Sequence, residues 1–165
     1  MCMKLSVKDP GSALTHFIAM ILAVLAAAPL LLKAAFFTDR LHVAALAVFI
    51  VSMILLYAAS TVYHTFDISE GVNRLLRKID HMMIFILIAG SYTPICVIPL
   101  RDTVGIPLLI LVWAVAIAGM LIKAFWITCP KWFSSTIYIA MGWLCVLAMV
   151  PLVQTLPTAA FIWLG

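Results

Sequence analysis

Charged residues are scarce in this chain of 165 residues, because Asp, Glu, Lys and Arg together make up only 10% of it. A soluble domain is about 25% charged and about 45–50% apolar, whereas this chain is 67% apolar. A soluble fold of this length cannot bury so much apolar surface, but a bilayer accommodates it because lipid solvates the apolar side chains. The composition therefore excludes a soluble fold and predicts one membrane domain over residues 1–165.

Motifs that would indicate other functions are also missing. The four cysteines include no C-x-x-C pair, so the sequence does not support a cysteine zinc site or a thiol redox motif. The basic residues stand singly or in one small group between apolar runs, and none of these stretches alternates with aromatic residues. The net charge of +4 therefore indicates membrane topology signals and no nucleic-acid partner.

Long apolar runs fill most of the chain, and a helix needs about 20 such residues to cross a bilayer. The predicted full spans are residues 13–32, 41–64, 79–100, 104–126 and 136–153, and residues 156–164 form part of a sixth. The first run is longer than the core of a signal peptide, which is about 7–15 residues, and this favours a spanning helix over a cleaved leader. The predicted fold class is an all-α polytopic transmembrane bundle.

The basic residues predict the orientation of these spans. Seven would lie on one side of the membrane and three on the other, and the positive-inside rule places the larger group in the cytoplasm. The N-terminus is therefore expected inside. The larger group is Lys4, Lys8, Arg74, Arg77, Lys78, Lys123 and Lys131.

Small residues recur at helix-contact spacing within the runs. Lipid-embedded helices pack closely through such residues, and the same spacing permits a helix-mediated homo-oligomer. The residues concerned are Ala23 with Ala27, Ala114 with Ala118, Gly90 and Gly119.

Polar side chains inside the runs need a separate explanation, because ionisable groups are costly within a bilayer. Ser60 and His64 lie four residues apart at the inner end of the second run, with Tyr57 on the same side. Asp80 follows a short connection, which makes the second and third helices antiparallel neighbours. We therefore expect Ser60, His64 and Asp80 to converge near the cytoplasmic face. His16 is read as an interfacial residue.

Two interpretations fit this convergence. Neutral imidazole is a common zinc ligand, and a carboxylate can bind the metal or act as a base on its water. Alternatively, Asp80 caps the third helix and pairs with Arg77, while His64 lies among the headgroups. Spacing alone favours the second interpretation, since a catalytic zinc site normally has three protein ligands. The stretch 67–78 is read as a polar connection, part of it lying along the membrane surface.

Five stretches of the sequence resemble the hemolysin III family, the bacterial branch of the progestin and adipoQ receptor superfamily. They cover nearly the whole chain, and the second and third are the most specific, with S-x-x-x-H followed by Asp at the start of the next helix. The stretches are D-P-G-S-A-L-T-H at 9–16, L-L-Y-A-A-S-T-V-Y-H at 55–64, K-I-D-H at 78–81, A-G-S-Y-T-P at 89–94 and M-G-W at 141–143.

The resemblance implies a seven-helix fold in the bacterial inner membrane with a cytoplasmic N-terminus. It implies zinc as the cofactor, membrane lipid as the partner, and zinc-dependent hydrolysis of a lipid amide or ester as the activity. His64 corresponds to a zinc ligand, Asp80 to the residue that holds the zinc-bound water, and Ser60 to their polar partner. The resemblance thus favours the metal-site interpretation of these three residues.

The chain departs from the family pattern in one respect that bears on activity. The family places an H-x-x-x-H on its seventh helix, and no such motif occurs here. The sequence stops within the predicted sixth run, which suggests a truncated product, a partial chain or a divergent short form. We therefore expect zinc binding to be weak or absent, and two further functions remain open. These are a membrane-perturbing, hemolysin-like protein involved in cytolysis, and a non-enzymatic membrane regulator or receptor-like protein.

Overall fold

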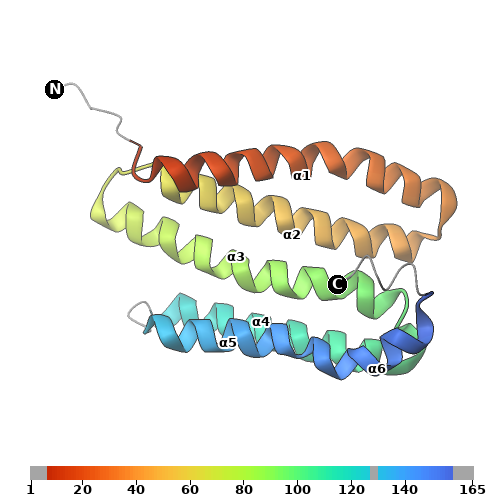
Figure 1. Cartoon of the computed structure of the whole chain (residues 1–165). Coiled ribbons are helices and arrows are strands. Elements are labelled where there is room, and N and C mark those ends of the chain that lie inside the picture. Colours follow the sequence, from red (N-terminus) through yellow and green to blue (C-terminus); the bar gives the residue numbers. More distant parts are fainter. Residues whose placement is uncertain (1–6, 127–129, 158–165) are drawn as a thin grey trace.

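The computed structural model describes residues 7–126 and 130–157, which form long helices joined by short connections. Within these ranges, five helical stretches are long and apolar enough to cross a membrane, counting η1 with α4 and α5 with α6. This confirms the predicted all-α polytopic bundle. The elements are α1 (Pro10–Phe37), α2 (Arg40–Thr65), α3 (Glu70–Val97), η1 (Arg101–Gly105), α4 (Ile106–Phe125), α5 (Lys131–Trp143) and α6 (Cys145–Thr155) (Figure 1).

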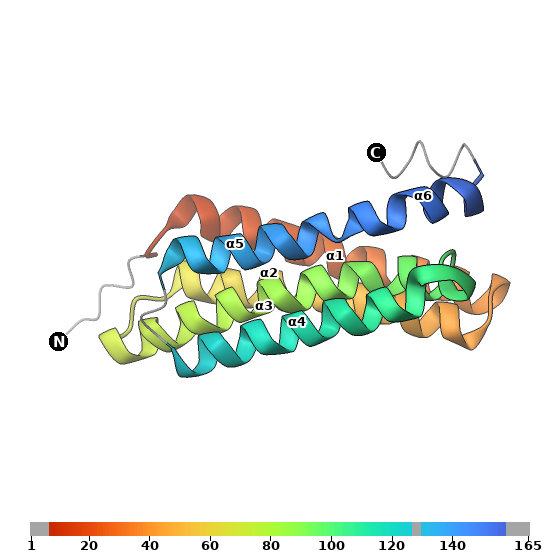
Figure 2. The ribbon, with the colours of Figure 1, turned by 90° about the horizontal axis from the view of Figure 1, so that it is seen from below.

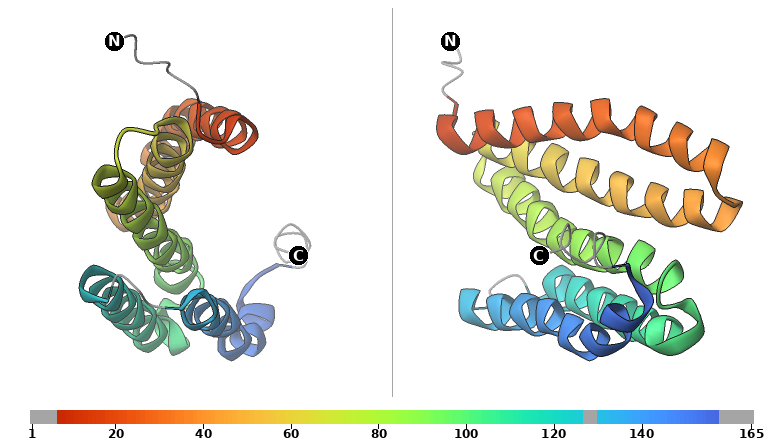
Figure 3. Two further views of the ribbon diagram at one scale, coloured as in Figure 1. Left: turned by 90° about the vertical axis from the view of Figure 1, so that its left-hand side faces the viewer. Right: turned by 45° about the vertical axis from the view of Figure 1, so that its right-hand side comes forward.

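The helices run alternately up and down the bundle. α1 packs against α2, α2 against α3, and α3 against both α4 and α5. Figure 2 shows α4 and α5 from the side opposite α1, and the end-on view in Figure 3 shows the helices following an arc from α1 to α5. The start of α1, the α2–α3 connection and the end of α4 lie together, and we call this end the N-terminal end of the bundle (Figure 1).

The most closely packed part of the bundle surrounds the second half of α3. Phe85 is almost fully buried there, and a Cβ atom on Gly119 of α4 would overlap its ring, so glycine allows the close approach of these two helices. The Tyr92 hydroxyl lies 2.9 Å from the backbone oxygens of both Met141 and Gly142, which ties α3 to α5. By contrast, α1 leaves most of its apolar side chains exposed, as a lipid-facing helix does.

The third helix begins earlier than the sequence predicted. Ser69 caps α3 by accepting a hydrogen bond from the Val72 amide at 3.4 Å, and the helix then continues without a break through Lys78. The predicted polar connection over residues 67–78 is therefore helical from Glu70 onward, and only residues 66–69 connect α2 with α3. The basic residues lower the hydropathy of this stretch but do not stop a capped helix, and Lys78 donates to the backbone oxygen of Ala124 at the end of α4.

Two other boundaries also differ from expectation. The predicted run 136–153 forms two helices, α5 and α6, that meet at Leu144. Ahead of α4, η1 makes a tight turn in which a Cβ atom on Gly105 would overlap the backbone of Leu100, so only glycine fits there. Most of the predicted partial run 156–164 lies outside the described residues, as do Cys2 and Cys129.

Candidate functional site

The predicted site residues lie at the N-terminal end of the bundle, on the packed pair α2 and α3. Ser60 is 4% exposed and lies one turn before His64, near the end of α2. Asp80 is 9% exposed and lies in the third turn of α3. The structure therefore places all three residues on neighbouring helices near the same end of the bundle.

Asp80 does not have the capping role that spacing alone favoured. The N-cap of α3 is Ser69, eleven positions earlier, so the capping interpretation of Asp80 is wrong. The ion pair recorded for Asp80 joins its Oδ2 to the Nδ1 of His81 at 3.8 Å, and no ion pair among the described residues joins it to Arg77. The His81 Nδ1 lies much closer, at 2.6 Å, to the backbone oxygen of Arg77. A carboxyl group so well buried in a spanning helix is unusual and calls for a functional explanation.

His64 has its own carboxylate partner, from a part of the chain that the prediction did not use. The Oδ2 of Asp9 lies 3.2 Å from the Nδ1 of His64, and the Ser12 hydroxyl donates to the same oxygen at 2.8 Å. The Ser12 hydroxyl is the main cause that lowers the pKa of Asp9, with His64 adding to it, so this carboxyl is ionised near neutral pH.

Aromatic rings surround His64 on two sides. The His16 ring of α1 stacks on it with centroids 5.7 Å apart, and the Tyr63 ring meets it edge-on at 4.9 Å. Tyr57 lies 5.9 Å from His16. We call Asp9, Ser12, His16, Tyr57 and His64 the N-terminal polar cluster. His16, which was interpreted as an interfacial residue, therefore also contacts the ring of His64.

Sequence reasoning missed Asp9 and His16 as partners of His64. Both lie in the stretch D-P-G-S-A-L-T-H, at its first and last positions. The signal was therefore present in a stretch that carried the family resemblance, but no spacing rule connects residue 9 with residue 64.

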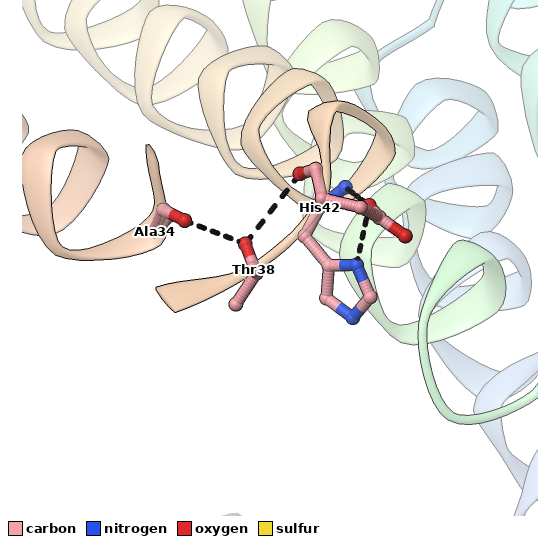
Figure 4. A network of polar contacts seen from close by, with 4 residues as sticks. Ala34, Thr38 and His42 are labelled. Atoms are coloured by element: carbon pink, nitrogen blue, oxygen red, sulfur yellow. Dashed lines mark hydrogen bonds and ion pairs between the residues drawn. The ribbon is translucent and has the colours of Figure 1, made fainter. Parts of the chain in front are cut away.

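A second Asp–His pair lies at the opposite end of α2. The Oδ1 of Asp39 accepts from the backbone amide of His42 at 2.9 Å and lies 2.7 Å from its Nδ1. Figure 4 shows this pair, with the Thr38 hydroxyl donating to the backbone oxygen of Ala34 at 2.7 Å. Hydrogen bonds from His42 lower the pKa of Asp39. This arrangement is a helix cap.

A zinc ion in a catalytic site needs three protein ligands placed around one point. The described residues contain no group of three His, Cys, Asp or Glu side chains placed to hold a metal ion. The contacts of His64 and Asp80 are with Asp9 and His81 respectively, so their predicted convergence on one ion stays a prediction. On these residues alone, the chain does not provide the three protein ligands that a catalytic zinc site requires.

Comparison with known proteins identifies the family. The model of the family described as "Haemolysin-III related" matches residues 6–164. The "Hemolysin-3 homolog" of Bacillus subtilis (strain 168) is 37% identical over 154 residues, which cover 93% of this chain and 72% of that protein. "Hemolysin-3" of Bacillus cereus is 38% identical over 154 residues, covering 93% of this chain and 70% of that protein. No solved structure matches the chain. The family match and the multi-pass helical fold together show that this chain belongs to the haemolysin-III related family of membrane proteins.

Proposed function

We propose that the N-terminal end of this bundle carries part of a zinc-dependent lipid hydrolase site, with His64 as a metal ligand, Asp80 as the carboxylate beside the metal and Ser60 as their polar neighbour. One observation supports this most strongly. Asp80 is only 9% exposed within a membrane-spanning helix, next to α2, on which Ser60 is also buried. Ionisable groups kept in such positions usually serve function.

The position of the site favours a lipid substrate. His64 lies one residue before the end of α2, and Asp80 lies in the third turn of α3, at the same end of the bundle. We propose that this end lies near the level at which lipid headgroups meet the hydrocarbon region. The bond that we propose to be hydrolysed is a lipid amide or ester. The distribution of basic residues, seven of which fall on this side, favours the cytoplasmic leaflet of an inner membrane.

The proposal includes an expectation about this chain on its own. His64 and Asp80 are two of the groups that the site needs, and the described residues supply no complete set of three. We therefore expect the purified chain to bind zinc weakly, and a longer family member with an H-x-x-x-H motif to bind it firmly.

The experiment compares the two proteins side by side in detergent or lipid. Zinc content is measured by elemental analysis, and hydrolysis is measured with a lipid amide and a lipid ester. In the longer protein, Ala at the positions aligned with His64 and Asp80 should lower both values, whereas Ala at the position of His42 serves as the matched control. Unchanged zinc content and hydrolysis in the first two variants would overturn the proposal.

Two other functions each have an observation in their favour. The names of the relatives, "Hemolysin-3 homolog" and "Hemolysin-3", favour a membrane-perturbing protein involved in cytolysis. The incomplete donor set favours a non-enzymatic membrane regulator. Dye release from liposomes, compared with an unrelated helical membrane protein at equal density, separates them, because only the membrane-perturbing protein should exceed the background.

A further inference from the structure

The segment before α1 is bound to the last turn of α2. The backbone amide of Asp9 donates to the backbone oxygen of His64 at 2.9 Å, and the amide of Lys8 donates to that of Thr65 at 3.3 Å. The last carbonyl groups of a helix have no partner within the helix, so these bonds satisfy groups that would otherwise need water. The Lys8 ammonium also lies 3.8 Å from the centre of the Tyr63 ring. The segment therefore fixes Asp9 beside His64.

The side chain of Asp9 does not act as an ordinary cap. Asp9 is the N-cap residue of α1, but its carboxylate makes no capping hydrogen bond to the backbone of that helix. The Oδ2 atom is instead shared between the Ser12 hydroxyl and the Nδ1 of His64. The carboxylate therefore contacts both the first turn of its own helix, through the Ser12 hydroxyl, and the ring of His64 on α2.

This contact favours one of the two ring nitrogens of His64 as the site of the proton. An ionised carboxylate only accepts hydrogen bonds, so a proton on the Nδ1 that lies 3.2 Å from Asp9 is the arrangement in which the two groups attract each other. In the neutral imidazole the other nitrogen, Nε2, then holds the lone pair. The stacked His16 ring and the edge of Tyr63 limit rotation of the His64 ring about this bond.

Stability is a poor explanation for the pair. The Asp9 side chain is 49% exposed, and exposed ion pairs contribute little to folding because water and salt screen them. Histidines that bind metals or move protons commonly donate their second ring N–H to a carboxylate, which sets the tautomer and the ring direction. The Asp9–His64 contact has this geometry.

We propose that Asp9 is a positioning residue for His64. The Asp9 carboxylate accepts the Nδ1–H of the His64 ring across the α1–α2 boundary, and this leaves Nε2 as the ring nitrogen whose lone pair is available for binding. The Asp9–Ser12 contact orients the carboxylate. The tautomer itself does not depend on a metal, whereas its use in hydrolysis rests on the function proposed above.

The test reads the tautomer directly, without zinc or substrate. The chain, with its four histidines labelled with nitrogen-15, is placed in lipid bilayers at about pH 8.5, where an ordinary imidazole with a pKa of about 6.5 is neutral. Ring nitrogen shifts distinguish Nδ1–H from Nε2–H, and His64→Gln assigns the signal. We expect His64 to be mainly the Nδ1–H form, and Asp9→Ala to make this the minor form.

Matched variants separate positioning from folding. Asp9→Asn keeps a side-chain oxygen that can accept, so it should retain more of the Nδ1–H form than Asp9→Ala. Asp39→Ala removes the Asp–His pair at the opposite end of α2 and should leave the His64 signal unchanged. A wild-type His64 that is mainly Nε2–H would overturn the proposal even if the variants failed to fold. So would a tautomer ratio that is the same in Asp9→Ala as in the wild type. Because this readout involves no hydrolysis, absence of lipid hydrolase activity would count against the proposed function alone.

Discussion

The two ends of α2 each carry an Asp–His pair, and the two pairs differ in what they connect. Asp39 and His42 are three residues apart, and the carboxylate accepts from both the backbone amide and the ring of His42. Asp9 and His64 are 55 positions apart in the chain and belong to different helices. The first pair caps the start of α2, whereas the second connects the N-cap of α1 with the end of α2.

This difference separates a structural contact from one suited to function. A local cap satisfies backbone groups wherever a helix starts, and its value lies in that helix. The contact at the other end orients a ring that also lies against His16 and Tyr63, near the buried Asp80 of the next helix. The same two residue types thus serve different purposes because of what surrounds them.

The largest expected effect comes from separating α2 and α3. A side chain on Gly90 would overlap Ser52, so Gly90→Leu should destabilise the bundle by about 1–3 kcal/mol. Gly71→Leu is the matched control, because a Cβ atom there meets nothing within 4 Å, and it should change stability by less than about 0.5 kcal/mol. Thermal unfolding in detergent measures both. Equal losses in the two variants would show that α2 and α3 are not closely packed at this point.

A smaller effect is expected from the buried carboxyl of Asp80 at the N-terminal end of the bundle. If Asp80 is kept for chemistry, Asp80→Asn should leave stability within about 1 kcal/mol of the wild type or raise it, because sites kept for function are rarely optimal for folding. Thermal unfolding of the same preparation provides the measurement. A loss above about 2 kcal/mol would instead make Asp80 a structural residue.

The two Asp–His pairs should respond differently to alanine. Asp39→Ala removes the cap of α2 and should speed hydrogen exchange of the His42 amide severalfold, with the change confined to the first turn of that helix. Asp9→Ala should instead alter the exchange and ring signals of His64, in a helix to which residue 9 does not belong. Residue-resolved hydrogen exchange would contradict the comparison if both variants affected only their nearest neighbours in sequence.

The smallest effect concerns pH at the capped end. The pKa of Asp39 is lowered in the folded chain by its hydrogen bonds from His42, so its stabilising effect is present above the ordinary aspartate pKa. The effect is lost as pH falls through the lowered folded value, which lies in the range below about pH 4. Asp39→Asn keeps a capping oxygen that does not titrate, so the first turn of α2 should lose this part of its acid sensitivity. Exchange of the His42 amide followed from pH 6 down to about pH 2 measures it.

The sequence predicted the spanning helices well. A helix must contain about 20 apolar residues to cross the bilayer, and runs of that length are easy to recognise. It also placed Ser60 and His64 on one helix, since both lie in the apolar run 41–64. It failed at the start of α3, where a capped helix begins within the basic stretch. The run 136–153 lies within one candidate span, which is divided into α5 and α6 at Leu144. Asp9 and His16 were missed because their contacts with His64 depend on how α1 and α2 pack, which no local pattern encodes.

The central claim is that function lies at the end of α2 that carries His64 and not at the end that carries His42. It is tested most directly by measuring lipid hydrolysis in two variants of a longer family member with the H-x-x-x-H motif. Alanine at the position of His64 should lower the rate by about 100-fold or more, as expected for loss of a group at the reacting centre. Alanine at the position of His42 should lower it by less than about twofold, since that residue belongs to a helix cap. Equal rates for the two variants would contradict the assignment of function to the N-terminal end.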